Sequence, residues 1–253
     1  MIADDLISAI GLPFKTRMNQ RVPKKLLLEN GASTASDKRQ INDGIEEIHW
    51  LAAIKPQTIG VLDYRDEVRE YLEIAALSLV LRGEVKSARL MELVHRAVPY
   101  PVLLIVMQDR YLGLSLAHKR WSQSEADKVV VDGDVVAVAL ENWDSVSAIE
   151  MQFMQAIALD RQPRTTLYDL YQGWMDTLYA LHAARLTGTF VVAATPGQAA
   201  TRRLALQECR SLNGEAARLQ SLAAKEKQLA RLVDLNLELK RVQAELTAAK
   251  ERL

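Results

Sequence analysis

The chain has 253 residues, of which 49% are hydrophobic and 25% are charged, a composition typical of a folded protein and far from that of a disordered one. Its 32 Lys and Arg residues balance 32 Asp and Glu residues, so no overall charge favours non-specific binding to nucleic acid or to an acidic membrane. The single cysteine, Cys209, excludes an internal disulfide and a zinc site built from cysteines.

The first residues do not resemble a secretory signal. Asp4 and Asp5 precede a short apolar run at the position where a signal peptide carries basic residues. No uninterrupted apolar run approaches the roughly 20 residues that cross a bilayer. We therefore expect a cytoplasmic protein without a membrane partner, in which Cys209 stays reduced.

The chain begins with a short helix and a basic segment. Acidic residues in the first turn favour a helix over residues 3–10, which Gly11 and Pro13 end. Residues 15–39 hold seven basic side chains against two acidic ones. These cations are Lys15, Arg17, Arg21, Lys24, Lys25, Lys38 and Arg39. The segment is a candidate contact for DNA phosphates or for an acidic protein, and a solvated basic loop is the alternative.

Helix and strand patterns then alternate. Ile41, Ile45 and Ile48 recur at helical spacing and predict a helix over residues 37–55. The later elements are a strand over residues 71–83, a helix over 84–98 and a buried strand over 102–108. An alternating strand over residues 110–119 follows.

A hairpin signal closes this part of the chain. Asp132 and Gly133 stand between two Val-rich runs, a pattern typical of a tight β-turn. Residues 1–145 are therefore expected to form an α+β core domain, with a mixed or mainly antiparallel sheet backed by helices.

Residues 146–194 are expected to be a helical extension of this core. Helices are predicted over residues 145–160 and 165–188, and the second carries an apolar stripe that includes Trp174. Such a stripe is typical of a core or of a partner surface. The segment "TPGQ", residues 195–198, predicts a turn that separates the globular part from the C-terminal residues 199–253.

The C-terminal residues 199–253 contain no proline and one glycine, and this predicts a single long helix. Its apolar residues alternate in steps of four and three, as in a coiled coil. This seam consists of Leu232, Leu235, Leu239, Val242, Leu246, Ala249 and Leu253. Upstream, Leu219, Leu222 and Leu229 follow another phase, so a discontinuity is expected at "LARLVDLNL". Two alternatives stay open: a coiled coil with another chain, including a homodimer, or a hairpin folded back on residues 146–187.

No motif in the sequence identifies a catalysed reaction. No glycine-rich phosphate loop occurs, and the four histidines have no metal-ligand spacing, so no metal or cofactor is expected. Asp66, Glu84 and Lys86 match the loose D…E-x-K spacing of metal-dependent nucleases, in which two carboxylates hold Mg²⁺ and a lysine steadies the attacking water. Glu84 and Lys86, however, fall at a predicted helix start rather than on a strand.

Four segments together carry a family resemblance: "VPKKLLLENGASTASDKRQINDGIEEIHWLAAIKPQTIGV", "HRAVPYPVLLIV", "LYQGWMDTLYALHAARLTGTF" and "KEKQLARLVDLNLELK". The chain resembles the bacterial domain-of-unknown-function 4391 family. Members of that family tend to be encoded beside DNA methyltransferases and helicases of type III restriction or related phage-defence systems.

The resemblance implies a non-catalytic assembly or regulatory subunit that binds a methyltransferase or helicase, with indirect contact to DNA. Leu229, Trp174 and the seam residues are then the expected partner-binding side chains. The alternatives are a divalent-metal nuclease and a DNA-binding module that uses residues 15–39.

Overall fold

The computed structural model describes residues 2–83, 85–109, 111–125, 128–140 and 147–253. The predicted domain boundary at residues 145 and 146 lies outside these described residues. The chain forms two units, residues 1–178 and residues 179–253, and the division falls within one continuous helix, α7 (Leu167–Thr187).

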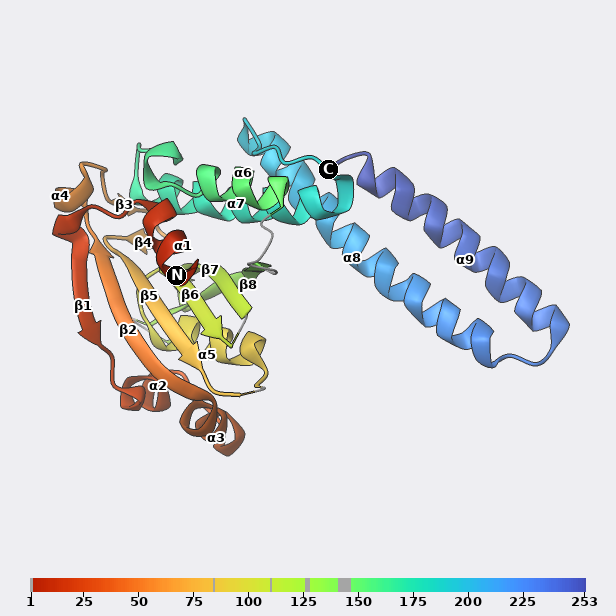
Figure 1. Ribbon diagram of the computed structural model, residues 1–253, viewed down its shortest axis with the longest axis horizontal. Coiled ribbons are helices and arrows are strands. Elements are labelled where there is room, and N and C mark those ends of the chain that lie inside the picture. The colour runs from red at the N-terminus through yellow and green to blue at the C-terminus, as the bar shows by residue number, and fades with distance from the viewer. Residues whose placement is uncertain (1, 84, 110, 126–127, 141–146) are drawn as a thin grey trace. The chain divides into compact units, whose positions relative to one another are not determined.

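A six-stranded sheet is the centre of the first unit (Figure 1). Its strands, in spatial order, are β1 (Arg17–Arg21), β2 (Ile45–Ile54), β5 (Ile74–Leu81), β6 (Val102–Gln108), β7 (Tyr111–Trp121) and β8 (Val129–Leu140). Among the described strands of this sheet, β5 and β6 pair in parallel and the other neighbours pair antiparallel, and α5 (Ser87–Ala97) connects β5 and β6. The prediction of an α+β fold with a mixed sheet backed by helices is confirmed.

The remaining elements of this unit are short apart from α7. A second, two-stranded sheet pairs β3 (Tyr64–Arg65) with β4 (Glu70–Tyr71). The other helices are α1 (Ile2–Ile10), η1 (Phe14–Thr16), α2 (Lys24–Asn30), α3 (Ala35–Gly44), α4 (Pro56–Ile59), α6 (Ala148–Ala156) and η2 (Leu159–Arg161).

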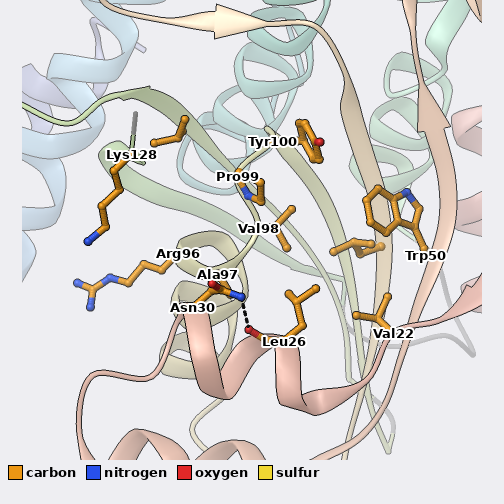
Figure 2. Close-up of a pocket in the computed structure, with 12 residues that line it drawn as sticks. Val22, Leu26, Asn30, Trp50, Arg96, Ala97, Val98, Pro99, Tyr100 and Lys128 are labelled. Carbon is orange, nitrogen blue, oxygen red and sulfur yellow. Dashed lines mark hydrogen bonds between the residues drawn. The ribbon is translucent and has the colours of Figure 1, made fainter. Parts of the chain in front are cut away.

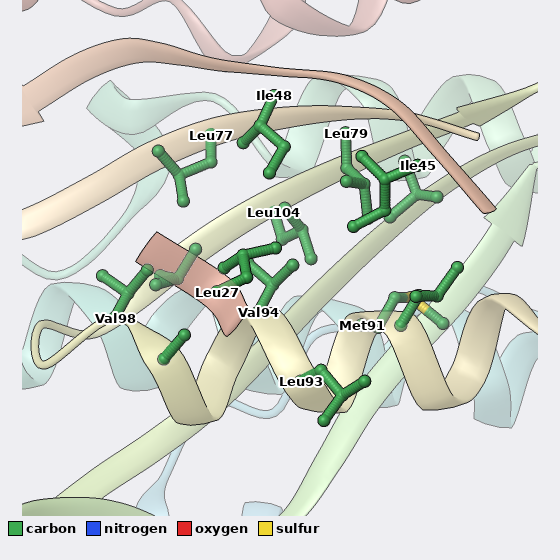
Figure 3. Close-up of a cluster of buried hydrophobic side chains, with 14 of the residues drawn as sticks. Leu27, Ile45, Ile48, Leu77, Leu79, Met91, Leu93, Val94, Val98 and Leu104 are labelled. Atoms are coloured by element: carbon green, nitrogen blue, oxygen red, sulfur yellow. The ribbon is translucent and has the colours of Figure 1, made fainter. Parts of the chain in front are cut away.

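The main core lies between one face of the sheet and the helices α2, α3 and α5 (Figure 3). Alternate residues of β5 and β6 face these helices, since successive side chains of a strand point to opposite faces. Thus Leu77, Leu79 and Leu104 pack against Leu27 of α2 and Val94 of α5. Burial of such side chains, worth about 0.8 kcal/mol for each CH₂ group, holds the helices on the sheet.

The opposite face of the sheet is buried as well. Leu112, Leu114 and Leu116 of β7 are almost fully buried there. On the same face, Nε2 of His118 lies 2.9 Å from Oε1 of Gln172 in α7. The hydroxyl of Tyr171 donates to the carbonyl of Val102 at 2.7 Å, so α7 is fixed to the sheet within this unit.

The predicted helix over residues 37–55 is wrong in its second half. The helix α3 ends at Gly44, and the chain enters β2 at Ile45. The pairing of β2 with β5 shifts register between Ile45 and Glu47, which marks a β-bulge. Because of this irregularity, Ile45 and Ile48 both reach the same core although three positions separate them, and their spacing imitates a helix.

The predicted hairpin turn at Asp132 and Gly133 is also wrong, because both residues lie inside β8. Gly133 has a φ angle of +77°, a conformation that glycine adopts without strain. His118 pairs with Asp132 and Leu116 pairs with Val136, so β8 carries extra residues opposite β7. Asp132 and Gly133 therefore form a bulge inside the continuous strand β8.

The second unit is built from the C-terminal part of α7 and the helices α8 (Pro196–Lys225) and α9 (Leu229–Lys250). The predicted turn at residues 195–198 is instead the start of α8, where the Thr195 side chain accepts the N–H of Gln198. The predicted single helix is divided in two: the Glu226 carboxylate accepts the N–H groups of Lys227 and Gln228, both at 2.8 Å. The chain reverses there, and α8 and α9 form an antiparallel hairpin (Figure 1).

Candidate functional site

The predicted coiled-coil seam is the inner face of the α8–α9 hairpin. Val242 is buried against Ala216 and Leu219 of α8, and Leu235 and Leu239 pack on the same cluster. The other seam residues of α9 and the C-terminus are half-buried or buried: Leu232, Leu246, Ala249 and Leu253. The seam therefore packs on α8 of the same chain, and neither on another chain nor on residues 146–187, the two alternatives that the sequence left open.

A second apolar row lies on the outer face of α9. Leu229, Val233 and Leu237 are 76%, 50% and 60% exposed, respectively. They recur every four residues, so they form one line along the helix surface. Leu222, near the end of α8, is 43% exposed. We call Leu229, Val233 and Leu237 the outer stripe. The sequence predicted another phase for Leu222 and Leu229, and the structure places them on different helices of the hairpin and leaves both exposed.

Polar contacts fix the open end of the hairpin. Nε of Arg202 donates to the carbonyl of Leu253 at 3.1 Å, and Nη1 of the same residue donates to the carbonyl of Val191 at 2.6 Å. Arg252 and Glu208 form an ion pair at 2.7 Å. We call these contacts the clasp. They join the start of α8 to the end of the chain.

Trp174, a predicted partner-binding residue, lies in the core of the first unit. Its side chain is fully buried, and its indole N–H donates to the carbonyl of Ile157 at 2.9 Å. It is therefore covered by its own chain and does not form part of an exposed surface.

The seven cations of residues 15–39 are spread over η1, β1, α2 and α3 rather than gathered on one loop. Several contact acids close in sequence or space, as in the ion pairs Lys25–Glu29 at 3.5 Å and Arg39–Asp43 at 3.4 Å. The structure therefore spreads the predicted nucleic-acid contacts over several elements, and acidic neighbours pair with Arg21, Lys25 and Arg39.

Three of these cations lie on or near the edge of the sheet. Arg21 pairs with Glu47 at 3.6 Å. Burial, and then the neighbouring Arg82 and Arg21, lowers the pKa of Lys24. The guanidinium of Arg17 lies 5.8 Å from the ring centre of Phe14. The positions of Lys15 and Lys38 are exposed.

The nuclease residues are not brought together by the described part of the chain. The Asp66 carboxylate accepts the hydroxyl of Tyr64 at 2.8 Å and the N–H of Val68 at 2.7 Å, so it closes a local turn. Asp66 precedes the eight-residue strand β5, whereas Lys86 follows it, and such a strand is roughly 25 Å long. Glu84 lies outside the described residues. Among those described, no group of three or more His, Cys, Asp or Glu side chains forms a metal site.

A pocket of about 520 Å³ opens into the main core beside α2 and α5 (Figure 2). Apolar side chains of four elements and of the loop after α5 form its floor, among them Leu26, Leu77 and Val98. Trp50 of β2 and Tyr100 add aromatic rings. The polar side chains of the lining are Asn30, Arg96 and Lys128. Among the residues that the structure describes, the lining holds apolar, aromatic, amide and cationic side chains, a composition suited to binding a ligand.

The family model described as Domain of unknown function (DUF4391) matches residues 10–246. The chain belongs to this family. No curated protein and no solved structure matches it.

The DUF4391 match extends over both the pocket and the outer stripe. It ends before Arg252 and Leu253, so two of the five clasp residues lie beyond the matched residues. Among the helices that the structure describes, none combines the length and the apolar character needed to cross a membrane.

Sequence reasoning missed the pocket of this DUF4391 protein. Its lining comes from residues between Val22 and Val129, which the chain brings together only by folding. One signal was present: "HRAVPYP" places Arg96 and Tyr100 beside two prolines, directly after a helix and before a buried strand. Such a segment is a typical place for a binding loop.

Proposed function

We propose that this protein is a non-catalytic assembly or regulatory subunit of a bacterial restriction-modification or phage-defence complex, and that the outer stripe is its protein-binding surface. The observation that carries the proposal is the pair of apolar faces on α9. The inner face is already covered by α8, while Leu229, Val233 and Leu237 remain exposed.

Exposed aliphatic side chains at this spacing favour a helical partner. Residues four apart on a helix form a ridge that fits the groove of another helix, as in coiled coils and helix-in-groove complexes. Burial of one Leu or Val side chain contributes about 1.5–3 kcal/mol. The family resemblance supplies the partner class, a DNA methyltransferase or helicase encoded beside the gene.

The test is co-purification with these neighbouring gene products. We expect the triple variant Leu229→Gln, Val233→Gln, Leu237→Gln to bind the partner on the order of 100-fold more weakly, because a polar stripe gains nothing from burial. Gln keeps the helix propensity, so circular dichroism should show unchanged helix content.

The matched control is Leu204→Gln, which changes a leucine that is 66% exposed on α8 and not part of the outer stripe. It should bind the partner normally. Normal co-purification of the triple variant contradicts the proposal. A fall in solution mass from dimer to monomer, with the partner still bound, identifies a second copy of the chain as the occupant of the stripe instead.

A further inference from the structure

The pocket beside α2 and α5 has the size and lining of a small-molecule site. Its volume of about 520 Å³ falls within the range of roughly 300–1,000 Å³ that is usual for ligand pockets. Such pockets are mostly apolar and carry a few polar groups that orient the ligand. The lining of this pocket has that composition, because three polar side chains accompany apolar and aromatic ones.

The aromatic groups lie on one side of the pocket (Figure 2). The indole N–H of Trp50 donates to the carbonyl of Ala52 at 2.9 Å, which fixes the ring and satisfies its polar atom. The ring faces are therefore the surface that Trp50 offers to a ligand. Tyr100 follows Pro99 and is 39% exposed. A planar aromatic group would find stacking partners there.

The charged groups lie on the other side (Figure 2). Arg96 and Lys128 are the charged residues of the lining, and both are cations. Each is held by a neighbour on its own segment: Arg96 pairs with Glu92 at 2.6 Å and Lys128 pairs with Glu125 at 2.7 Å. Neither Glu92 nor Glu125 lines the pocket, so the charged side chains that the described lining presents to a ligand are cations.

One neutral polar group completes the lining. The side-chain N–H of Asn30 donates to the carbonyl of Leu26 at 3.0 Å, as the dashed line in Figure 2 shows. This contact uses one of its two N–H groups and leaves its carbonyl oxygen as an acceptor for a ligand amino group.

We propose that this pocket binds a nucleotide. The base lies against Trp50 and Tyr100, and the phosphate lies at Arg96 and Lys128. An aliphatic carboxylate would satisfy one cation but would not use the aromatic rings, whereas a nucleotide provides both a planar ring and a multiply charged phosphate. The chemistry is the same for a free nucleotide and for one nucleotide of a single-stranded nucleic acid. This inference does not depend on the outer stripe.

The experiment uses the full chain and isothermal titration with two probes, adenosine 5′-monophosphate and a ten-nucleotide thymidine strand. We expect saturable binding of at least one probe. The double variant Arg96→Gln, Lys128→Gln should lower its affinity by at least roughly tenfold, because both charge-assisted contacts are lost.

The matched control is Arg231→Gln, Lys240→Gln, which removes the same charge from exposed positions of α9 that lie outside the lining and outside the basic residues 15–39. It should bind like the wild type. Tyr100→Ser should weaken binding of the nucleotide more than that of inorganic phosphate, because it removes a ring and leaves the cations in place. Melting curves of all variants verify that they fold.

Each result of these titrations either supports the nucleotide proposal or overturns it. Binding of the monophosphate alone identifies a free nucleotide as the ligand, and binding of the strand alone identifies a nucleotide within a nucleic acid; both support the proposal. Equal losses in the two double variants indicate a general charge effect and overturn it. Failure of both probes, or saturable binding of decanoate in their place, overturns it as well.

Discussion

At the scale of single residues, an unusual feature is a polar group of side chains inside the core. Lys119 of β7 is 1% exposed, and its amine donates to the carbonyl of Val98 at 2.7 Å and to the carbonyl of His95. Nε2 of His95 lies 3.0 Å from Oγ of Ser115. Burial lowers the pKa of Lys119 to about 7. The two N–H groups of a neutral amine match the two carbonyls.

This pKa makes the stability of the fold depend on pH. The unfolded Lys119 has a pKa near 10.5 and the folded one near 7, so between these values the unfolded chain binds a proton that the folded chain does not. The free energy of unfolding therefore rises by up to about 1.4 kcal/mol per pH unit from pH 7 toward pH 10.5. Below pH 7 both states are protonated and this contribution is constant.

The variant Lys119→Met tests this pH dependence of stability, since the methionine side chain has a length similar to that of lysine and carries no titrating group. Urea unfolding at pH 7.5 and pH 9.5 should show a smaller increase for the variant than for the wild type. The same increase in both proteins would show that Lys119 does not carry the pH dependence.

This polar group was not predictable from the sequence. His95 and Lys119 are far apart along the chain, and each stands in a segment where a polar residue is ordinary. Only the pairing of β6 with β7, and the packing of α5 on the sheet, bring them together. Local patterns show which residues alternate, but not which buried polar atoms meet.

At the scale of elements, helices and strands were predictable where the periodicity is regular. The apolar run of β6 and the one-sided pattern of α5 fall close to their predicted ranges. The failures occur at irregular backbone: a bulge in β2 imitates helical spacing, and Gly133 forms a bulge where a turn was expected. A bulge changes the spacing of core residues, so a fixed period misreads it.

The division of the C-terminal helix explains the phase break in its sequence. The seam continues regularly through α9 because α8 covers it, whereas Leu219 and Leu222 belong to α8 and Leu229 lies on the exposed face of α9. The sequence placed the discontinuity at residues 229–237, directly after the observed reversal at residues 226–228. A helical pattern without glycine or proline gave no sign that the chain turns back.

The two faces of α9 should respond differently to the same substitution. Val242 is 7% exposed in the hairpin, whereas Val233 is 50% exposed on the outer stripe. We expect Val242→Asp to destabilise the hairpin by about 3 kcal/mol, because it buries a charge, and Val233→Asp to change stability by less than about 0.5 kcal/mol. Urea unfolding followed by far-UV circular dichroism measures both, and equal losses would argue against the assignment of the faces.

At the scale of the whole molecule, the candidate binding features are distributed over both units. The pocket belongs to the first unit and the outer stripe to the second. The sequence predicted the α+β class and the helical C-terminal region correctly. It gave no sign of a division between Leu178 and Tyr179, because the helix α7 runs through that point.

A shortened hairpin tests whether the two features act independently. In this variant Leu212 is joined to Leu246 through the native Glu226–Lys227–Gln228 segment, which removes the outer stripe and keeps the clasp. We expect a soluble protein that binds the nucleotide probe normally and does not co-purify with the partner. Loss of nucleotide binding as well as of partner binding, with an unchanged melting temperature, would show that the pocket and the outer stripe are coupled.

The length of α9 determines the distance between the outer stripe and the clasp. Its 22 residues extend about 33 Å, with Leu229 at one end and the clasp beyond the other. A protein bound to the outer stripe would thus lie at a distance from the clasp that the length of α9 determines. Insertion of one heptad into each helix would lengthen this distance by about 10 Å while the inner seam keeps its phase. The hairpin can therefore be lengthened by whole heptads without loss of its inner packing.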